Sequence, residues 1–264
     1  MVQADGWQAL RSLTPARIAL GRAGASLPTA EVLRFGLAHA RARDAVWRRL
    51  DVAALLAELS ELPELAADGP VRQVHSAASD RGSYLLRPDL GRRLAPAADA
   101  ALRAAAAARA GPPPGLCFVL ADGLSAGALQ QHALPLLRTF RALAGERWAP
   151  APVVIAEQAR VALGDLIGEI LGARAVAVLI GERPGLSSPD SLGIYLTLAP
   201  RVGRSDAERN CISNVRPAGL PCADAARRLL WLLDAAVELG ATGVALKDRS
   251  AEALLGAAAA RALP

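Results

Sequence analysis

The chain has 264 residues, and 53% of them are hydrophobic, but alanine supplies much of that fraction and aromatic residues contribute only 3%. This length suffices for one large domain, or for one domain with an appended unit. The net charge of +5 permits an anionic partner. Because the arginines are scattered and not interleaved with aromatic residues, nucleic acid is disfavoured as that partner.

The sequence shows no sign of export or of a membrane span. The N-terminus lacks the apolar segment of a signal peptide. No apolar run approaches the roughly 18 residues of a spanning helix. The three cysteines, Cys117, Cys211 and Cys222, have neither metal-ligand nor disulfide spacing. We therefore expect a soluble, cytoplasmic protein without a metal site.

The first 110 residues favour helices. Trp7 to Leu27 has no clear pattern, whereas the apolar spacing from Thr29 to about Leu59 predicts a helical region, with Thr29 as the N-cap after Pro28. Val71 to Ser76 is a candidate short strand. Asp80 to Leu94 is dense in charge, and two interpretations stay open: an interface network, or a solvated loop leading into a helix.

An alanine-rich helix is predicted over Ala95 to Ala110, and Gly111 to Pro114 follows as the clearest linker. The linker predicts two parts. Residues 1–110 form a mainly helical region, and residues 115–264 form an α/β domain.

Beyond the linker, strands and helices alternate. Strands are expected at Leu116–Ala121, Pro152–Ala156, Ala175–Ile180, Leu192–Leu198 and Gly243–Leu246. Helices are expected from Ser125 to about Ala144 and at Leu163–Leu171, Ala223–Leu239 and Ala251–Leu263, with an irregular loop at Pro200–Val215. The alternation predicts an α/β fold with a mostly parallel, Rossmann-like sheet flanked by helices.

The stretch around Glu182 is the strongest candidate for a binding site. The apolar strand Ala175–Ile180 leads directly into Gly181-Glu182-Arg183-Pro184-Gly185. Open α/β sheets bind ligands at such strand ends, and glycine there lets the backbone approach a flat ligand. Pro184 should stiffen the loop that carries the Glu182 carboxylate. The alternative is a surface turn with an exposed glutamate.

A catalytic constellation is not found. The three histidines have no ligand spacing: His39, His75 and His132. Asp122 follows a strand as a candidate general base, although capping the next turn is favoured. Asp165 and Glu169 lie four apart and share a helix face, but with no His or Cys near them a paired metal site is disfavoured. The pattern indicates a chain that binds a ligand and lacks its own nucleophile.

Seven blocks resemble the small subunit of ethanolamine ammonia-lyase, an adenosylcobalamin-dependent enzyme. They are ARIALGRAGASLPT (Ala16–Thr29), LAHARARDAV (Leu37–Val46), SDRGSYLLRPDLGRRL (Ser79–Leu94), ADGLSAGAL (Ala121–Leu129), QARVALGDLIGEILGA (Gln158–Ala173), GERPGLSSPDSLGIY (Gly181–Tyr195) and ERNCISNVRPAG (Glu208–Gly219). They keep their order and are spread along the chain from Ala16 to Gly219.

The resemblance implies a role in a radical lyase that converts ethanolamine to acetaldehyde and ammonia. The α/β domain would lie against the corrin of adenosylcobalamin, and the barrel of a separate large subunit would hold the substrate. The family's cobalamin contacts map onto Val161, through its backbone amide, Glu182 and Cys211. The N-terminal region would contact the large subunit in a hetero-oligomer.

On this basis the chain is expected to be inactive alone and to contribute neither a catalytic residue nor a metal ligand. Enclosure in a bacterial microcompartment stays open. Two alternatives are a stand-alone nucleotide-binding α/β module, which the lack of a Gly-x-Gly-x-x-Gly motif after any strand disfavours, and a purely structural partner subunit.

Overall fold

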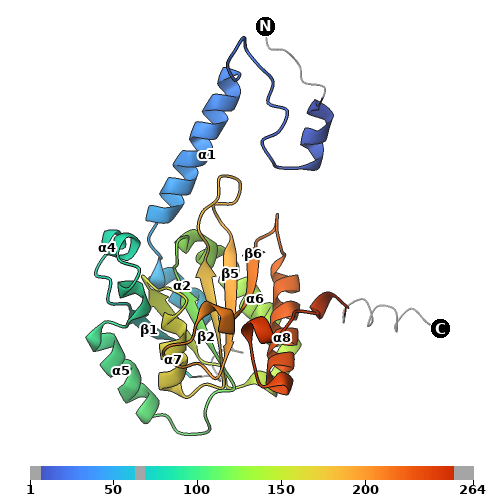
Figure 1. Cartoon of the computed structure of the whole chain (residues 1–264). Helices are drawn as coiled ribbons and strands as arrows, with labels where there is room; N and C mark the ends of the chain where they lie inside the picture. The colour runs from blue at the N-terminus through green and yellow to red at the C-terminus, as the bar shows by residue number, and fades with distance from the viewer. Residues whose placement is uncertain (1–6, 63–68, 253–264) are drawn as a thin grey trace, which may run out of the picture.

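The computed structural model describes residues 7–62 and 69–252, and its centre is a six-stranded sheet (Figure 1). The strand order is β1-β3-β2-β4-β5-β6. The strands are β1 (Arg72–His75), β2 (Leu116–Ala121), β3 (Val153–Glu157), β4 (Ala175–Gly181), β5 (Leu192–Leu198) and β6 (Asn210–Val215).

The first four strands in this order, β1, β3, β2 and β4, run parallel, as expected. β5 is antiparallel to β4, and β6 is antiparallel to β5, which the prediction of a mostly parallel sheet did not include. The reason is the connection 182–191, which is short and holds no helix, whereas a parallel return needs a crossover of about a dozen residues or more. The α/β class is confirmed, and the finer Rossmann-like assignment stays a prediction.

Helices cover both faces of the sheet, and the central strands β2 and β4 are therefore buried on each side. One face packs against α2 (Val52–Ser60), α6 (Ala126–Ala144) and α8 (Cys222–Leu239). The opposite face packs against α5 (Pro96–Ala107) and α7 (Leu163–Leu171). The shorter elements are α4 (Arg81–Leu86), η1 (Gln8–Leu13), η2 (Leu90–Arg92), η3 (Gly145–Trp148), η4 (Asp206–Glu208) and η5 (Gly243–Ala245).

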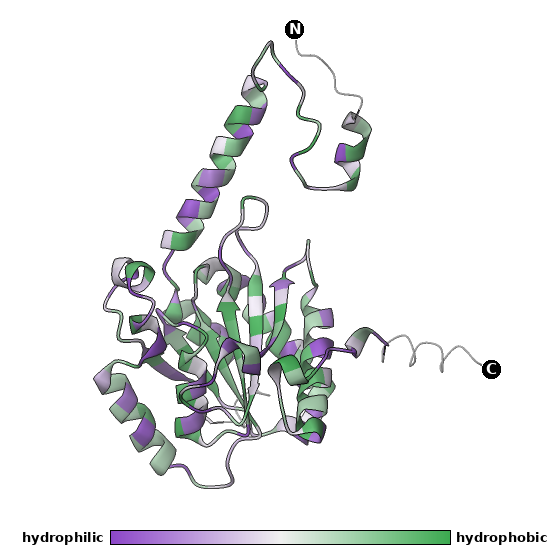
Figure 2. Cartoon of the chain, in the orientation of Figure 1, coloured by the Kyte–Doolittle hydropathy of each residue, from purple (hydrophilic) through white to green (hydrophobic). Residues whose placement is uncertain are grey.

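The helix α1 (Thr29–Trp47) projects from the sheet as an arm (Figure 1). Of its residues only Ala38 is buried, while Leu33 and Phe35 are 67% and 46% exposed. Figure 2 shows hydrophobic residues interleaved with polar ones along its whole length. The segment before α1 contacts it, since Arg11 pairs with Glu31 at 3.0 Å and the Arg17 guanidinium lies 5.7 Å from the ring centroid of Phe35.

Several predicted elements differ in the structure. The helical region expected from Thr29 to Leu59 is two helices, and Thr29 is the first helical residue while Pro28 occupies the cap position. Part of the loop expected at Pro200–Val215 is the edge strand β6, whose polar residues face outward. The strand expected at Gly243–Leu246 is the 3₁₀ turn η5, because Gly243 has φ +81°.

Two further expectations are not tested by the structure. The helix predicted at Ala251–Leu263 falls almost entirely outside the described residues. The division into residues 1–110 and 115–264 stays a prediction, and the structure adds that β1 and α5, which precede the linker, pack with the same sheet.

Two helical glycines provide a test of this packing. A Cβ at Gly164 in α7 would lie 2.2 Å from Cγ2 of the buried Val178, whereas at Gly36 in α1 no described atom lies within 4 Å of the Cβ position. Gly164→Ala should lower the free energy of unfolding by about 1–3 kcal/mol through overpacking. Gly36→Ala should leave it unchanged or raise it by up to about 1 kcal/mol. Urea denaturation measures both, and equal effects would contradict the α7–β4 packing.

Candidate functional site

The loop after β4 rests on the loop after β2 through a close backbone contact. A Cβ at Gly181 would lie 2.0 Å from the Ser125 carbonyl oxygen, and one at Gly123 would lie 2.3 Å from the Gly181 carbonyl oxygen. The Leu124 amide donates to that same Gly181 oxygen at 2.9 Å. Glycine at 181 therefore permits an approach within the chain itself, and the expectation that it makes room for a ligand is wrong.

Glu182 is half-buried and anchored. Both of its carboxylate oxygens accept from the Asn214 amide of β6 at 3.2 Å. Its Oε1 lies 3.1 Å from the Cβ position of Gly193 in β5, so the carboxylate lies over that strand. The alternative of a freely exposed glutamate on a surface turn does not describe this geometry.

Cys211 lies on β6 directly beside Tyr195 of β5, and their side chains are hydrogen-bonded. Desolvation raises the pKa of the Cys211 thiol, although the residue as a whole is exposed. Desolvation, together with the neighbouring Cys211, also raises the pKa of Tyr195 to about 12. Both groups are therefore neutral at pH 7, and Cys211 is suited to contact a ligand and not to attack one.

Val161 lies where the chain leaves β3 and enters α7. The two preceding amides are occupied: Ala159 donates to Asp122 Oδ1 at 3.1 Å, and Arg160 donates to the Gly91 carbonyl at 2.8 Å. No described residue accepts a hydrogen bond from the Val161 amide. That amide is available for a ligand, as the backbone role implied for Val161 requires.

Two of these positions, Glu182 and Cys211, lie at one area of the sheet, and Val161 packs on the same side of it. Tyr195 lies between Val178 of β4 and Cys211 of β6 in register, and it packs against the same apolar cluster as Val161. Whereas α7 covers β4 on this side, the β5–β6 part carries the half-buried Tyr195 and the exposed Cys211. We call this area the Tyr195 face: Gly193, Tyr195, Cys211 and Ser213, with Val161 and Glu182 at its margin.

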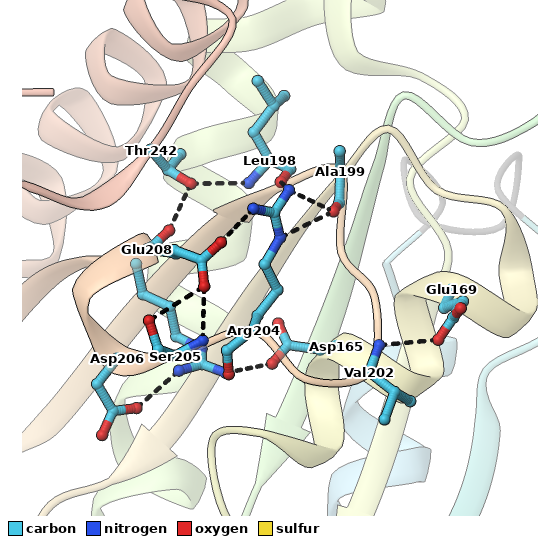
Figure 3. A network of polar contacts seen from close by, with 11 residues as sticks. Asp165, Glu169, Leu198, Ala199, Val202, Arg204, Ser205, Asp206, Glu208 and Thr242 are labelled. Atoms are coloured by element: carbon cyan, nitrogen blue, oxygen red, sulfur yellow. Dashed lines mark hydrogen bonds and ion pairs between the residues drawn. The ribbon is translucent and has the colours of Figure 1, made fainter. Parts of the chain in front are cut away.

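A buried ion-pair network holds the loop 199–209 beside this face (Figure 3). Arg209 pairs with Asp165 of α7, and their side chains are only 2% and 4% exposed. Arg209 also pairs with Asp206 at 2.7 Å, and the Val202 amide donates to Glu169 Oε2 at 2.9 Å. Asp165 and Glu169 thus share a helix face, as predicted, and both bind this loop.

Asp122 is a structural carboxylate. It is buried, accepts from the Ala159 amide and lies 3.3 Å from Arg81 Nη1. Burial raises its pKa to about 6. Arg81 in turn donates to the carbonyls of Gly123 at 2.8 Å and Val46 at 2.7 Å, so it joins the loops at the strand ends to the base of α1.

Sequence reasoning missed three contributors to this site. Tyr195 lies in the predicted strand Leu192–Leu198, but nothing in the pattern indicated that one face of this strand lacks a covering helix. Asn214 lies in the segment expected to be irregular. The pairing of Asp165 with Arg209 spans 44 positions of sequence, and charge spacing along one helix does not indicate such a partner.

Comparisons with known proteins identify the family of this chain. The sequence profile of the family described as ethanolamine ammonia-lyase light chain matches residues 4–247. The chain belongs to that family.

Its relatives named ethanolamine ammonia-lyase small subunit match along nearly the whole chain. The one from Xanthomonas campestris pv. campestris (strain ATCC 33913) is 56% identical over 253 residues, covering 96% of this chain and 91% of the relative. The one from Azotobacter vinelandii is 56% identical over 250 residues, covering 94% and 90%. This chain is thus a light-chain subunit of a lyase. Among its described helices, none is long and apolar enough to cross a membrane.

The buried carboxylate of this light chain predicts a pH dependence. Because the pKa of Asp122 in the folded state, about 6, lies above its ordinary value of 3.8, its contribution to stability is full below pH 3.8 and is lost as the pH rises through 6. Asp122→Asn removes this titration. The stability of the parent relative to the variant should therefore fall by roughly 2–3 kcal/mol between about pH 4 and pH 7.

Urea denaturation at several pH values across that window measures the difference. Asp89→Asn is the control, because hydrogen bonding from Arg87 lowers the pKa of Asp89 and moves its titration below the window. A stability difference between the parent and the Asp122→Asn variant that stays constant with pH would contradict the assignment.

Proposed function

We propose that this light chain helps to bind adenosylcobalamin at an interface with a large subunit, for the conversion of ethanolamine to acetaldehyde and ammonia. One observation carries the proposal. Of the three positions that the resemblance assigns to cobalamin, Glu182 and Cys211 lie on one uncovered area of the sheet, the Tyr195 face, and Val161 packs against the same apolar cluster as Tyr195.

The chemistry of this face suits a corrin, which is a flat ring system with amide side chains at its edge. A corrin amide can donate to the Glu182 carboxylate, and a corrin carbonyl can accept from the Val161 amide. Between them, Tyr195 and Cys211 present neutral, weakly polar surface against which the ring can lie. Asn214 fixes the carboxylate in advance, which reduces the entropy lost on binding.

The light chain's own part is to bind and orient. When bound, adenosylcobalamin supplies the radical chemistry of the lyase. The side chains of the Tyr195 face supply no nucleophile or base, because burial keeps the Cys211 thiol and the Tyr195 hydroxyl protonated at pH 7. Ethanolamine would then be held and processed on the large subunit, and the light chain alone should release no ammonia.

The arm α1 is the surface that we assign to the large subunit. Several large apolar residues of α1 are exposed, among them Val32, Leu33, Phe35 and Leu37, and such exposed apolar surface is typical of a protein interface. The relatives of this chain are named small subunits, which implies a larger partner subunit. The partner would therefore enclose the arm on more than one side.

Substitutions of Glu182 test cofactor binding directly. Glu182→Gln keeps the shape and one acceptor but loses the charge, and hydrogen bonds to charged groups contribute about 1.5–3 kcal/mol against about 0.5–1.5 for neutral ones. The Gln variant should weaken cobalamin binding to the assembled complex by about tenfold, and Glu182→Ala should weaken it further. Equilibrium titration followed by the cobalamin absorbance measures both dissociation constants.

Glu146→Gln is the matched control, because Glu146 is exposed in η3, before β3 and away from the strand ends. It should bind cobalamin like the parent. If both Glu182 variants also bind like the parent, the subunit is a purely structural partner at this loop and the proposed site is wrong.

Charged substitutions in the arm test the interface. Leu33→Asp and Phe35→Asp place a charge on exposed apolar surface, so the isolated chain should keep its stability. A carboxylate buried at an interface without a partner is strongly unfavourable, and each variant should weaken assembly with the large subunit at least about tenfold. Val244→Asp, at an exposed position of η5, is the control. Unchanged assembly in sedimentation velocity would exclude the arm from the interface.

A further inference from the structure

A cavity of about 570 Å³ lies beside Val161, between η2, the start of α7 and the loop 199–209. Four arginines contribute to its wall, Arg92, Arg160, Arg204 and Arg209, together with the carboxylates Asp165 and Asp206. The cavity is thus separate from the Tyr195 face but shares Val161 with it.

The charges of this wall do not balance. Arg209 is neutralised by Asp165 and Asp206, and Arg204 is paired with Glu208. Arg92 and Arg160 form no ion pair with any carboxylate in the part of the chain that the structure describes. Because Arg209 is paired with two carboxylates, the four arginines and their three carboxylate partners leave one net positive charge, and Arg92 and Arg160 are the cations without a carboxylate partner. This arrangement favours an anion.

Arg160 is held in place before any ligand arrives. Its guanidinium lies 4.3 Å from the ring centroid of Tyr84, and Nη2 donates to the Tyr84 carbonyl at 3.2 Å. The tight contact with Gly91, where a Cβ would lie 2.8 Å from Arg160 Cγ, fixes the stem of the side chain. Its Nε is buried and has no hydrogen-bond partner among the described residues. An arginine whose guanidinium is already held in one orientation suits a phosphate group.

The start of α7 adds to this preference. The amides of Val161 and Ala162 donate to no described residue, and the N-cap residue of α7 provides no side-chain cap. The first two amides of the helix, those of Leu163 and Gly164, are bonded to the carbonyls of Arg160 and Val161, but the amino end of a helix still carries partial positive charge, which favours an anion. The helix end and the two arginines thus act on the same cavity.

We propose that Arg92, Arg160 and the amide of Ala162, the N-cap residue of α7, form a phosphate-binding site in this cavity. Because the cavity adjoins the Tyr195 face, the phosphodiester of the cobalamin nucleotide is one source of the phosphate, and a free phosphate compound is the other. The assignment to the cofactor rests on the proposed function, whereas the site itself does not.

Two measurements separate these sources. In the first, inorganic phosphate is titrated into the purified chain and followed by calorimetry. In the second, the complex with the large subunit is titrated with cobinamide and with cobinamide phosphate, which differ only in the phosphate group. Each is repeated with Arg92→Gln, Arg160→Gln, and the charge-retaining Arg160→Lys. Arg93→Gln is the control, because Arg93 is an exposed neighbour that pairs with Asp89 outside the cavity.

The parent should bind inorganic phosphate, and either Gln variant should weaken that binding by about tenfold, which corresponds to about 1.4 kcal/mol. Arg160→Lys should retain part of it, and Arg93→Gln all of it. If the complex prefers cobinamide phosphate and the Gln variants abolish this preference, the cofactor is the source. If only the binding of inorganic phosphate is lost, the site stands and the cofactor is excluded as its source.

The proposal is overturned if the chain binds no inorganic phosphate and the Gln variants leave the cobinamide preference unchanged. This failure is distinct from that of the proposed function. A complex that binds neither cobinamide nor cobalamin would overturn the proposed function. The titration with inorganic phosphate would still show whether the cavity binds phosphate.

Discussion

The antiparallel return of β5 is the constraint on which the candidate site depends. Parallel connections place a helix across a face of the sheet, so β2, β3 and β4 are covered on both sides. The connection 182–191 lacks a helix, and one side of β5 and β6 is left without cover. Glu182 stands at the start of that connection, and its hydrogen bond from the Asn214 amide joins the end of β4 to β6 across the intervening strand.

Buried arginines fix the loops around this opening. Arg81 and Arg209 each donate hydrogen bonds to several acceptors from different elements. Each arginine therefore fixes the relative positions of the loops that it joins. Replacing such pairs with apolar residues is often neutral for stability, whereas removing one partner is strongly destabilising. We therefore interpret these networks as determinants of loop geometry, while the apolar clusters on both faces of the sheet provide most of the stability.

Much of this fold was predictable from local patterns. The wholly apolar strands β2 and β4 and the helix α7 were predicted almost to the residue, because apolar runs and a glycine C-cap such as Gly172 are local signals. The direction of β5 and the existence of β6 depend on pairing between distant segments. Because most residues of β6 are polar and exposed, its sequence lacks the apolar pattern by which a strand is recognised. The loop of Glu182 was a candidate from its position at a strand end, whereas Val161 and Cys211 came from resemblance alone. The position of Glu182 beside Cys211 is visible only in three dimensions.

The position of Arg81 has a thermodynamic consequence. One guanidinium binds the Val46 carbonyl at the base of the arm and the Gly123 carbonyl under the Glu182 loop. The two ends are coupled if ordering one of them also orders the other. If capture of the arm by another protein tightens ligand binding at the strand ends by some factor, the ligand must tighten that capture by the same factor. The affinity of such a light chain for its partner would then depend on whether the ligand is bound.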